Sequence, residues 1–394
     1  MAKRLALYLH IPFCVRKCLY CDFLSYPSGS AESGCMTAYL KRLAEEITQA
    51  GKAYGDREIS SIFFGGGTPS SLPEGEIGAL TDAVRSAFFV HKDAEITIEC
   101  NPGTLNRGKL NEYRAAGINR LSFGLQSVHD DELKLLGRIH SYADFAENYR
   151  AAREAGFRNI NVDLMSGLPG QSVPAWEETL RSVAELVPEH LSAYSLIIEE
   201  GTPFYEKYRN GGPECAAELP LPDEDTERRM VHATGRILSE YGYRQYEISN
   251  YAKPGWECRH NLVYWRRGDY LGLGLGAAGC VDELRWKNTS DLTEYLDGES
   301  GTPGALRGSF PIPREEEEKL SREDCRFEAV MLGLRLNEGI LLDGYRERYG
   351  EDLSAARADW IGKMTKEGLL ETADGRLHLT ERGRDLMDYV VREY

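Results

Sequence analysis

The chain has 394 residues, of which 42% are hydrophobic and 28% charged, a balance typical of folded globular proteins. Its formal net charge of −16 and its sequence pI of about 5.1 argue against a broad surface for nucleic acid or anionic lipid. No stretch approaches the roughly 18 apolar residues of a membrane-spanning helix, and His10 and Pro12 interrupt the apolar run near the start. We therefore expect a cytoplasmic protein whose membrane contacts, if any, are peripheral and made through a partner.

Six short runs rich in β-branched and aromatic residues alternate with segments whose apolar residues return every three or four positions. The runs predict strands at residues 5–11, 60–66, 95–100, 119–125, 160–168 and 190–198. Such alternation is typical of a parallel sheet. Conspicuous residues follow the strands directly, and loops in that position converge on one face of a barrel. The pattern predicts an α/β fold with a partial (β/α)6 TIM-like barrel over residues 1–200.

Beyond residue 200 the composition changes. Residues 201–296, rich in aromatics and glycine, predict an extension of the barrel, and the Gly, Pro and acidic residues of 297–322 predict a linker. Residues 323–394 predict helices followed by a hairpin, an α+β order that resembles a winged helix. Residues 337–394 hold nine Arg or Lys against thirteen Asp or Glu, which favours an interaction or lid role over nucleic-acid binding.

Three of the nine cysteines, Cys14, Cys18 and Cys21, stand in the spacing Cys-x3-Cys-x2-Cys. An odd cysteine count does not indicate a disulfide framework. The spacing is too compact for the two separated ligand pairs of structural zinc, although Cys35 or His10 could complete such a site. Thiolates suit iron–sulfur clusters, and three of them leave one iron of a four-iron cluster open for a substrate or cofactor.

The three cysteines, with Tyr20 before the last, resemble the signature of radical S-adenosylmethionine (SAM) enzymes. That resemblance implies a 4Fe–4S cluster whose open iron binds SAM. The segments YLHIPFC, FFGGGTPS, IECNPG, GINRLSFGLQS, LGRIH and VDLMSGLPGQ narrow it to the oxygen-independent coproporphyrinogen III oxidase family. The resemblance places nine residues on cofactor-contact positions: Tyr8, Tyr20, Gly66, Gly67, Thr68, Glu99, Gln126, Arg138 and Asp163.

Two features resemble the HemW-type heme chaperones of that family more than its decarboxylating oxidases. The oxidase pattern continues with a cysteine two positions after Cys21, where this chain has Phe23, and residues 260–265 read HNLVYW. The resemblance implies a protein that binds heme, the cluster and SAM and delivers heme to an acceptor hemoprotein. It also makes a homodimer a candidate oligomeric state. Imidazole ligates heme iron and aromatic rings pack on porphyrin faces, which makes His260, Tyr264 and Trp265 candidate heme residues.

Alternatives remain at this stage. Other candidate heme ligands are His10, His129, His140 and Cys258. The same scaffold could instead carry out oxidative decarboxylation of coproporphyrinogen III, and the residues leave open whether SAM is cleaved. The acidic charge balance disfavours a radical enzyme that modifies RNA, so no nucleic-acid partner is expected. A metal-stabilised binding module without redox chemistry would not account for the glycine loop GGGTP.

Overall fold

The computed structural model describes residues 3–28, 34–209, 219–297 and 312–394. Its centre is a sheet in which six parallel strands lie side by side in chain order. These strands are β1 (Arg4–Ile11), β4 (Glu58–Gly66), β5 (Phe89–Cys100), β6 (Arg120–Gln126), β7 (Asn159–Ser166) and β8 (His190–Ser195). Each overlaps one predicted run, and the predicted α/β partial barrel is confirmed.

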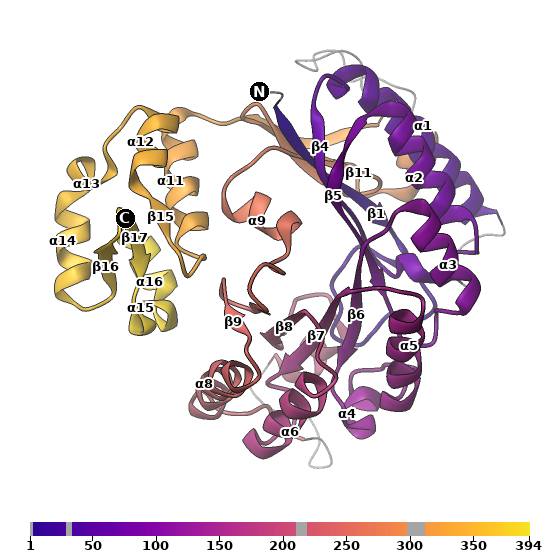
Figure 1. Cartoon of the computed structure of the whole chain (residues 1–394), viewed down its shortest axis with the longest axis horizontal. Coiled ribbons are helices and arrows are strands. Elements are labelled where there is room, and N and C mark those ends of the chain that lie inside the picture. The colour runs from indigo at the N-terminus through magenta and orange to yellow at the C-terminus, as the bar shows by residue number, and fades with distance from the viewer. Residues whose placement is uncertain (1–2, 29–33, 210–218, 298–311) are drawn as a thin grey trace.

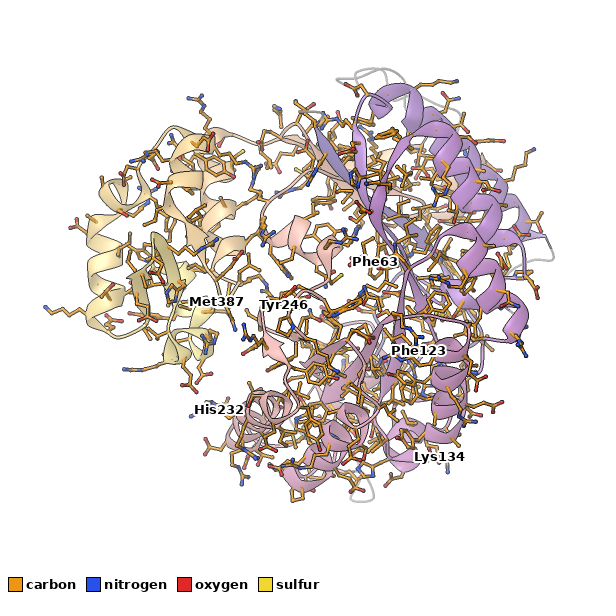
Figure 2. All side chains as sticks on the ribbon, viewed as in Figure 1. Phe63, Phe123, Lys134, His232, Tyr246 and Met387 are labelled. Atoms are coloured by element: carbon orange, nitrogen blue, oxygen red, sulfur yellow. The ribbon has the colours of Figure 1, made fainter. Side chains whose placement is uncertain are left out.

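Helices cover the convex face of this sheet (Figure 1). They are α1 (Cys35–Tyr54), α2 (Glu76–Ala87), α3 (Arg107–Ala116), α4 (Asp130–Leu135), α5 (Tyr142–Glu154), α6 (Val173–Ala184) and α8 (Glu224–Glu240). Strand residues of alternating position point to opposite faces. Figure 2 shows the result: Phe123 of β6 points toward α5, where its ring lies 5.8 Å from that of Phe145. The main hydrophobic core therefore lies between sheet and helices.

The opposite, concave face of the sheet is polar. On β5, Ile96 and Ile98 belong to the hydrophobic core, so Glu95, Thr97 and Glu99 point into the barrel. Phe63 of β4 shares this face and contacts the short helix α9 (Arg259–Trp265), which Figure 1 shows on the concave side. The barrel interior is thus lined with titratable groups.

Further strands extend the sheet at both edges. Strand β11 (Tyr270–Leu273) pairs parallel to β1, and β12 (Ala278–Val281), β13 (Leu284–Asn288) and β14 (Arg314–Lys319) continue antiparallel. At the other edge, β10 (Asn250–Ala252) and β9 (Arg244–Gln245) pair antiparallel beyond β8. Strand β14 lies inside the predicted linker 297–322, of which residues 298–311 are outside the described residues. Its sequence, REEEEK, is that of a charged edge strand and gives no apolar alternation to detect.

The C-terminal residues form an α+β unit with its own hydrophobic core. Its elements are α11 (Arg322–Gly333), β15 (Ile340–Leu341), α12 (Leu342–Tyr349), α13 (Leu353–Ala356), α14 (Ala358–Lys366), β16 (Leu370–Ala373), β17 (Arg376–Leu379), α15 (Glu381–Asp385) and α16 (Met387–Arg392). The predicted hairpin is confirmed as β16–β17, turned at Asp374 and Gly375. None of the helices in the described ranges has the length and apolar character needed to cross a bilayer.

Arg267 fastens this unit to the barrel extension. Its Nη2 donates to Glu283 (2.6 Å) and its Nε to Glu328 of α11 (3.0 Å), and only 7% of the side chain is exposed. Removing one partner of a buried ion pair leaves a charge without compensation, which makes this junction a costly one to open.

Glu46 of α1 is fully buried and joins the helix to the sheet extension. Its carboxylate accepts hydrogen bonds from the Gly274 N–H, the Asn288 side-chain amide and the Tyr295 hydroxyl, each at 2.8 Å. Burial raises the pKa of Glu46 to about 7. The helix that covers β1, the strand that leads into the cysteine loop, is therefore held by a carboxylate rather than by packing alone.

Replacing Glu46 with Ala should lower the free energy of unfolding by roughly 3 kcal/mol or more, because three donors lose their acceptor in the interior. Urea denaturation of the full chain measures the change. The neighbouring Glu45→Ala, at a half-exposed side chain of the same helix, should shift stability by less than about 0.5 kcal/mol. Equal midpoints for the two variants would contradict this role for Glu46.

Candidate cluster and cofactor site

The loop after β1, which carries the cysteines, rests directly on the loop after β4. The Gly67 N–H donates to the Ile11 carbonyl (2.8 Å) and the Thr68 N–H to the Phe13 carbonyl (2.7 Å). A Cβ added to Gly67 would stand 2.7 Å from the Phe13 oxygen and 3.0 Å from Cys14 Sγ. Any side chain at position 67 would push the cysteine loop away, which gives GGGTP a physical reason.

The three cysteines lie on one short segment bounded by β2 (Phe13–Cys14) and β3 (Tyr26–Pro27). Cys14 is buried, whereas Cys18 and Cys21 are half-buried. Burial, and to a lesser degree the nearby Cys18 and Cys14, raises the pKa of Cys21 to about 11. As the side chains stand, no three His, Cys, Asp or Glu groups in the described ranges are placed to hold one metal ion. In its chemistry, this set of three soft donors beside a glycine cradle fits a 4Fe–4S cluster with one open iron.

Arg138 connects the cysteine loop to the ends of β5 and β6. Its Nη1 lies 3.7 Å from Cys18 Sγ and 3.5 Å from the Tyr20 hydroxyl, and its Nη2 donates to Asn101 Oδ1 (2.9 Å) and to the Gly124 carbonyl. A guanidinium in this position stabilises negative charge on a carboxylate or sulfur ligand.

Asn101 is a site residue that sequence reasoning missed. Besides accepting from Arg138, its side-chain amide donates to Thr68 Oγ1 (2.8 Å), and Thr68 Oγ1 in turn lies 3.5 Å from Cys14 Sγ. Its position could have identified it, because Asn101 is the first residue of the NPG loop directly after β5. Asn101 therefore ties the Arg138 and Thr68 positions together.

Glu99 and Asp163 place two carboxylates on the barrel interior, on β5 and β7. Glu99 Oε2 accepts from the Gly66 N–H (3.0 Å), and burial, followed by the charge of Asp163, raises the pKa of Glu99 to about 8. Asp163 accepts from the Asn161 amide (2.8 Å) and the Ser122 hydroxyl (3.3 Å), and burial raises its pKa as well. Such groups suit hydroxyl and ammonium partners, whose hydrogen bonds replace those of water.

Tyr8 and Gln126 complete the set. The His10 Nε2 faces the Leu24 carbonyl (2.8 Å), which can only accept, so Nε2 carries the proton and Nδ1 accepts from the Tyr8 hydroxyl (3.1 Å). Gln126 ends β6 with a positive φ of 75°, and its Oε1 accepts from the Tyr194 hydroxyl (2.9 Å). The predicted cofactor residues lie on the carboxyl-terminal half of the strands, in the loops beyond them, or in the cysteine loop.

The three candidate heme residues lie elsewhere, on α9. The His260 side chain is 1% exposed, with Nδ1 2.9 Å from the Ser61 hydroxyl and Nε2 3.0 Å from the Tyr264 hydroxyl. Burial lowers the pKa of His260 to about 3, so the ring is neutral. Coordination of iron by His260 therefore requires one of these hydrogen bonds to break. Trp265 differs, because its ring lies under the Arg335 guanidinium, 4.5 Å away.

The other candidate ligands are also engaged. His129 Nε2 lies 3.2 Å from the Ala175 carbonyl and His140 Nε2 lies 3.3 Å from the Leu125 carbonyl. Cys258 is buried and its thiol donates to Glu95 at 3.5 Å. His10 is occupied on both nitrogens. The described contacts of His129 and His140 involve Nε2 alone, so Nδ1 is the nitrogen through which either ring could bind iron.

A second polar layer below the cofactor residues was also missed from the sequence. His190 bonds Asn161 Oδ1 (2.6 Å) through Nδ1 and the Tyr246 hydroxyl (2.9 Å) through Nε2, and Arg120 is 2% exposed beside them. The period-two placement of polar residues on β5 to β8 was the available signal. This layer lies toward the amino-terminal end of the barrel, on the same side as His260.

Comparison with known proteins identifies the scaffold. Residues 8–183 match the model of the radical SAM superfamily, and residues 320–386 match the HemN C-terminal domain. The Heme chaperone HemW of Bacillus subtilis (strain 168) is 36% identical over 96% of this chain and 95% of its own length. This chain belongs to the HemW family. The HemW of Escherichia coli (strain K12) is 42% identical over 70% of both chains.

A solved structure gives the same relationship for the fold. Coproporphyrinogen III oxidase (HemN) from Escherichia coli, described as a radical SAM enzyme, has a TM-score of 0.81 at 26% sequence identity. The match covers 100% of this chain and 90% of that one. The C-terminal α+β unit of this HemW-family chain is thus part of the shared architecture.

Replacing Gly67 with Ala should prevent assembly of a stable cluster, because the new Cβ meets the Phe13 backbone, which cannot rotate away. Anaerobic reconstitution should yield less than about a tenth of the wild-type visible absorbance. A tenfold loss corresponds to about 1.4 kcal/mol in the free energy of cluster binding. Gly235→Ala is the matched control, since open space surrounds that helical glycine. Wild-type absorbance in the Gly67 variant would show that the close approach is unnecessary.

Glu99 should make the cofactor-free protein less stable as the pH rises. Its pKa is about 8 when folded against an ordinary value of 4.5, so its contribution to stability is present below about pH 4.5 and is lost as the pH rises through about 8. Glu99→Gln keeps an acceptor for Gly66 without this titration. Chemical denaturation should favour the variant by roughly 2–4 kcal/mol more at about pH 9 than at about pH 5. Parallel pH profiles for the two proteins would contradict the buried, neutral Glu99.

Proposed function

We propose that this chain is a heme chaperone that binds heme, carries a 4Fe–4S cluster with SAM, and delivers heme to an acceptor hemoprotein. The observation that carries the proposal is its similarity, over 96% of its length, to a protein named Heme chaperone HemW. Phe23 adds support from the site itself. Phe23 is 64% exposed. It stands two positions after Cys21, where the sequence pattern of the decarboxylating oxidases has a further cysteine.

The residues at the carboxyl end of the barrel fit the two cofactors. Cys14, Cys18 and Cys21 would hold three irons, and a bound cluster supplies one-electron reduction chemistry. Arg138 offers a cation for a carboxylate, and the backbone at Gly66 and Gly67 permits close approach of a ligand. Glu99 and Asp163, with Tyr8 and Gln126, supply hydrogen-bonding groups along the interior wall. The chain thereby positions a small charged ligand beside the cysteine loop and away from the helical core.

His260, Tyr264 and Trp265 remain candidates for heme contact. The hydrogen bonds of His260 to Ser61 and Tyr264 mean that direct ligation by His260 would be accompanied by a rearrangement of α9. A cytoplasmic location, an acceptor hemoprotein, the homodimer and the absence of a nucleic-acid partner are further parts of the proposal.

The second candidate function is oxygen-independent oxidation of coproporphyrinogen III. The observation that favours it is the fold shared with HemN at a TM-score of 0.81, which includes the C-terminal unit. Both functions use the same cysteines, so they are separated by the fate of the porphyrin rather than by the cluster.

One anaerobic experiment separates the two. Reconstituted protein with SAM and a reductant is given either coproporphyrinogen III or heme, and then an apo-hemoprotein. We expect heme binding and transfer without decarboxylation; formation of protoporphyrinogen would instead make the chain an oxidase.

Cys18→Ala should remove the visible cluster absorbance, whereas Cys35→Ala, which changes a cysteine outside the loop, should retain it. Loss of absorbance in the Cys35 variant would instead support a metal site in which Cys35 is the fourth ligand.

A further inference from the structure

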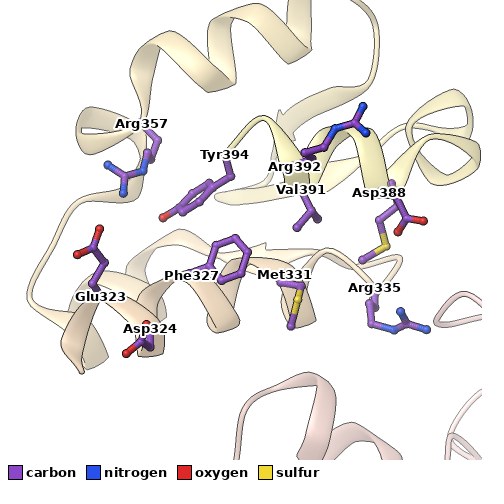
Figure 3. Close-up of a pocket in the computed structure, with 11 residues that line it drawn as sticks. Glu323, Asp324, Phe327, Met331, Arg335, Arg357, Asp388, Val391, Arg392 and Tyr394 are labelled. Carbon is purple, nitrogen blue, oxygen red and sulfur yellow. The ribbon is translucent and has the colours of Figure 1, made fainter. Parts of the chain in front are cut away.

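The C-terminal unit contains a cavity of about 640 Å³ between α11 and the segment that ends the chain (Figure 3). Its lining is balanced in charge, because it holds three arginines and three acidic residues: Arg335, Arg357, Arg392, Glu323, Asp324 and Asp388. The rings of Phe327 and Tyr394 contact each other, with their centres 5.7 Å apart. This cavity therefore has neither an excess of charge nor an open aromatic slot that would select a ligand. The carboxyl end of the barrel has a more specific arrangement, in which one amide links the donors that face two of the cysteines.

The side-chain amide of Asn101 is held in a single orientation. Arg138 can only donate hydrogen bonds, so the amide atom 2.9 Å from its Nη2 is the oxygen, Oδ1. The amide nitrogen of Asn101 then faces Thr68 and donates to Thr68 Oγ1 at 2.8 Å. The Asn101 backbone is fixed as well, because its N–H donates to Ser70 Oγ (3.1 Å) and its carbonyl accepts from the Thr104 hydroxyl (2.6 Å). The fold thus decides which end of the amide meets Thr68.

This orientation decides where the hydroxyl proton of Thr68 points. A hydroxyl has one proton to donate, and the amide N–H of Asn101 cannot accept it. Thr68 is 3% exposed, and its Oγ1 donates to Cys14 Sγ at 3.5 Å. Asn101 therefore directs the Thr68 hydroxyl at a cysteine sulfur.

Cys14 is held close to Thr68 by the backbone as well. Its side chain is 7% exposed, and its carbonyl accepts from the Ser28 N–H (2.7 Å) and the Ser28 hydroxyl (2.9 Å). The carbonyl of the preceding Phe13 accepts from the Thr68 N–H at 2.7 Å. The hydroxyl and the sulfur are thus carried by two segments that are bonded to each other.

The oxygen end of the same amide steadies Arg138. With Nη2 bonded to Asn101 Oδ1, Nη1 of Arg138 lies 3.7 Å from Cys18 Sγ. One amide therefore aims a neutral donor at Cys14 and a cation at Cys18. Hydrogen bonds to the sulfurs and the local charge are among the factors that set the reduction potential of an iron–sulfur cluster. Both donors stabilise the additional electron of the reduced state, which raises the potential.

We propose that Asn101 is a positioning residue that raises the reduction potential of the 4Fe–4S cluster. It acts through two donors, the Thr68 hydroxyl at Cys14 and the Arg138 guanidinium. The inference rests on the proposed function, because it concerns the cluster that this function includes. A higher potential makes the reduced cluster a weaker reductant toward a ligand at its open iron.

A redox titration of the anaerobically reconstituted full-length protein, followed by electron paramagnetic resonance of the reduced cluster, tests the proposal. Asn101→Asp replaces the amide donor with an acceptor, so the Thr68 proton turns from Cys14 to the new carboxylate. At the wild-type midpoint potential, the ratio of reduced to oxidised cluster should fall at least threefold. This is a shift of about 28 mV, since a factor of ten is about 59 mV for one electron. Thr68→Val should also lower the ratio, whereas Thr68→Ser, which keeps a hydroxyl, should restore it.

Two comparisons separate the hydrogen bond from the added charge. Asn106→Asp is the matched control, because Asn106 is exposed and Asp can replace it as the N-cap of α3. Its cluster should keep the wild-type potential. The double variant with Asn101→Asp and Thr68→Val should shift the potential by less than the sum of the two single shifts, because both changes remove the same hydrogen bond. Additive shifts would overturn the action of Asn101 through Thr68.

The outcomes separate the inference from the proposed function. Wild-type protein that assembles no cluster would overturn the inference together with the cluster of the proposed function. A cluster whose potential is the same in wild type, Asn101→Asp and Thr68→Val would overturn the inference alone. Circular dichroism and visible absorbance establish that each variant is folded and carries its cluster. Asn101→Ala and Thr68→Ala, which should also lower the potential, replace a variant that does not.

Discussion

The carboxyl end of the barrel, where the predicted cofactor residues lie, depends on how closely the chain after β1 can approach the chain after β4. The two strands pair in parallel up to His10–Gly65 and Ile11–Gly66, and the first loop then crosses directly over the second. At Gly66 an added Cβ would lie 2.6 Å from the His10 ring, and the backbone has a φ of +116°. Only glycine satisfies both conditions without strain. This contact fixes the position of the cysteine loop relative to the sheet, and with it the 3.7 Å distance between Arg138 Nη1 and Cys18 Sγ.

A polar barrel interior is expensive to desolvate, and its stability depends on how well the buried groups are paired. At the amino-terminal end the pairing is supplied by α9: Glu95 accepts from the His260 N–H at 3.0 Å, and the His260 ring bonds Ser61. The helix closes that end of the barrel, while the carboxyl end carries the cysteine loop. The imidazole of HNLVYW thus has a structural function that its residue type alone did not reveal.

The sequence predicted the six barrel strands because parallel strands covered by helices are short, apolar and regularly spaced. It predicted the glycines after β4 because their type is unusual at a strand end, whereas Arg138, which follows α4, was assigned only through the family resemblance. It could not predict Glu46, whose partners lie more than two hundred residues away, or β14, whose charges conceal its pairing. The burial of His260 was equally hidden, since a motif gives residue types and spacing but not the side of the helix that meets the barrel.

Helix α9 is also the physical connection between the barrel interior and the C-terminal unit. A continuous series of contacts runs from Glu95 to His260, from His260 to Tyr264, and from the adjacent Trp265 to Arg335 of the C-terminal unit. The buried Arg267 holds the two units at this junction. Communication between ligands of the two units would require an element with two positions that both ligands affect. Because α9 contacts the barrel interior through His260 and the C-terminal unit through Trp265, it is the element through which a change in one unit would reach the other.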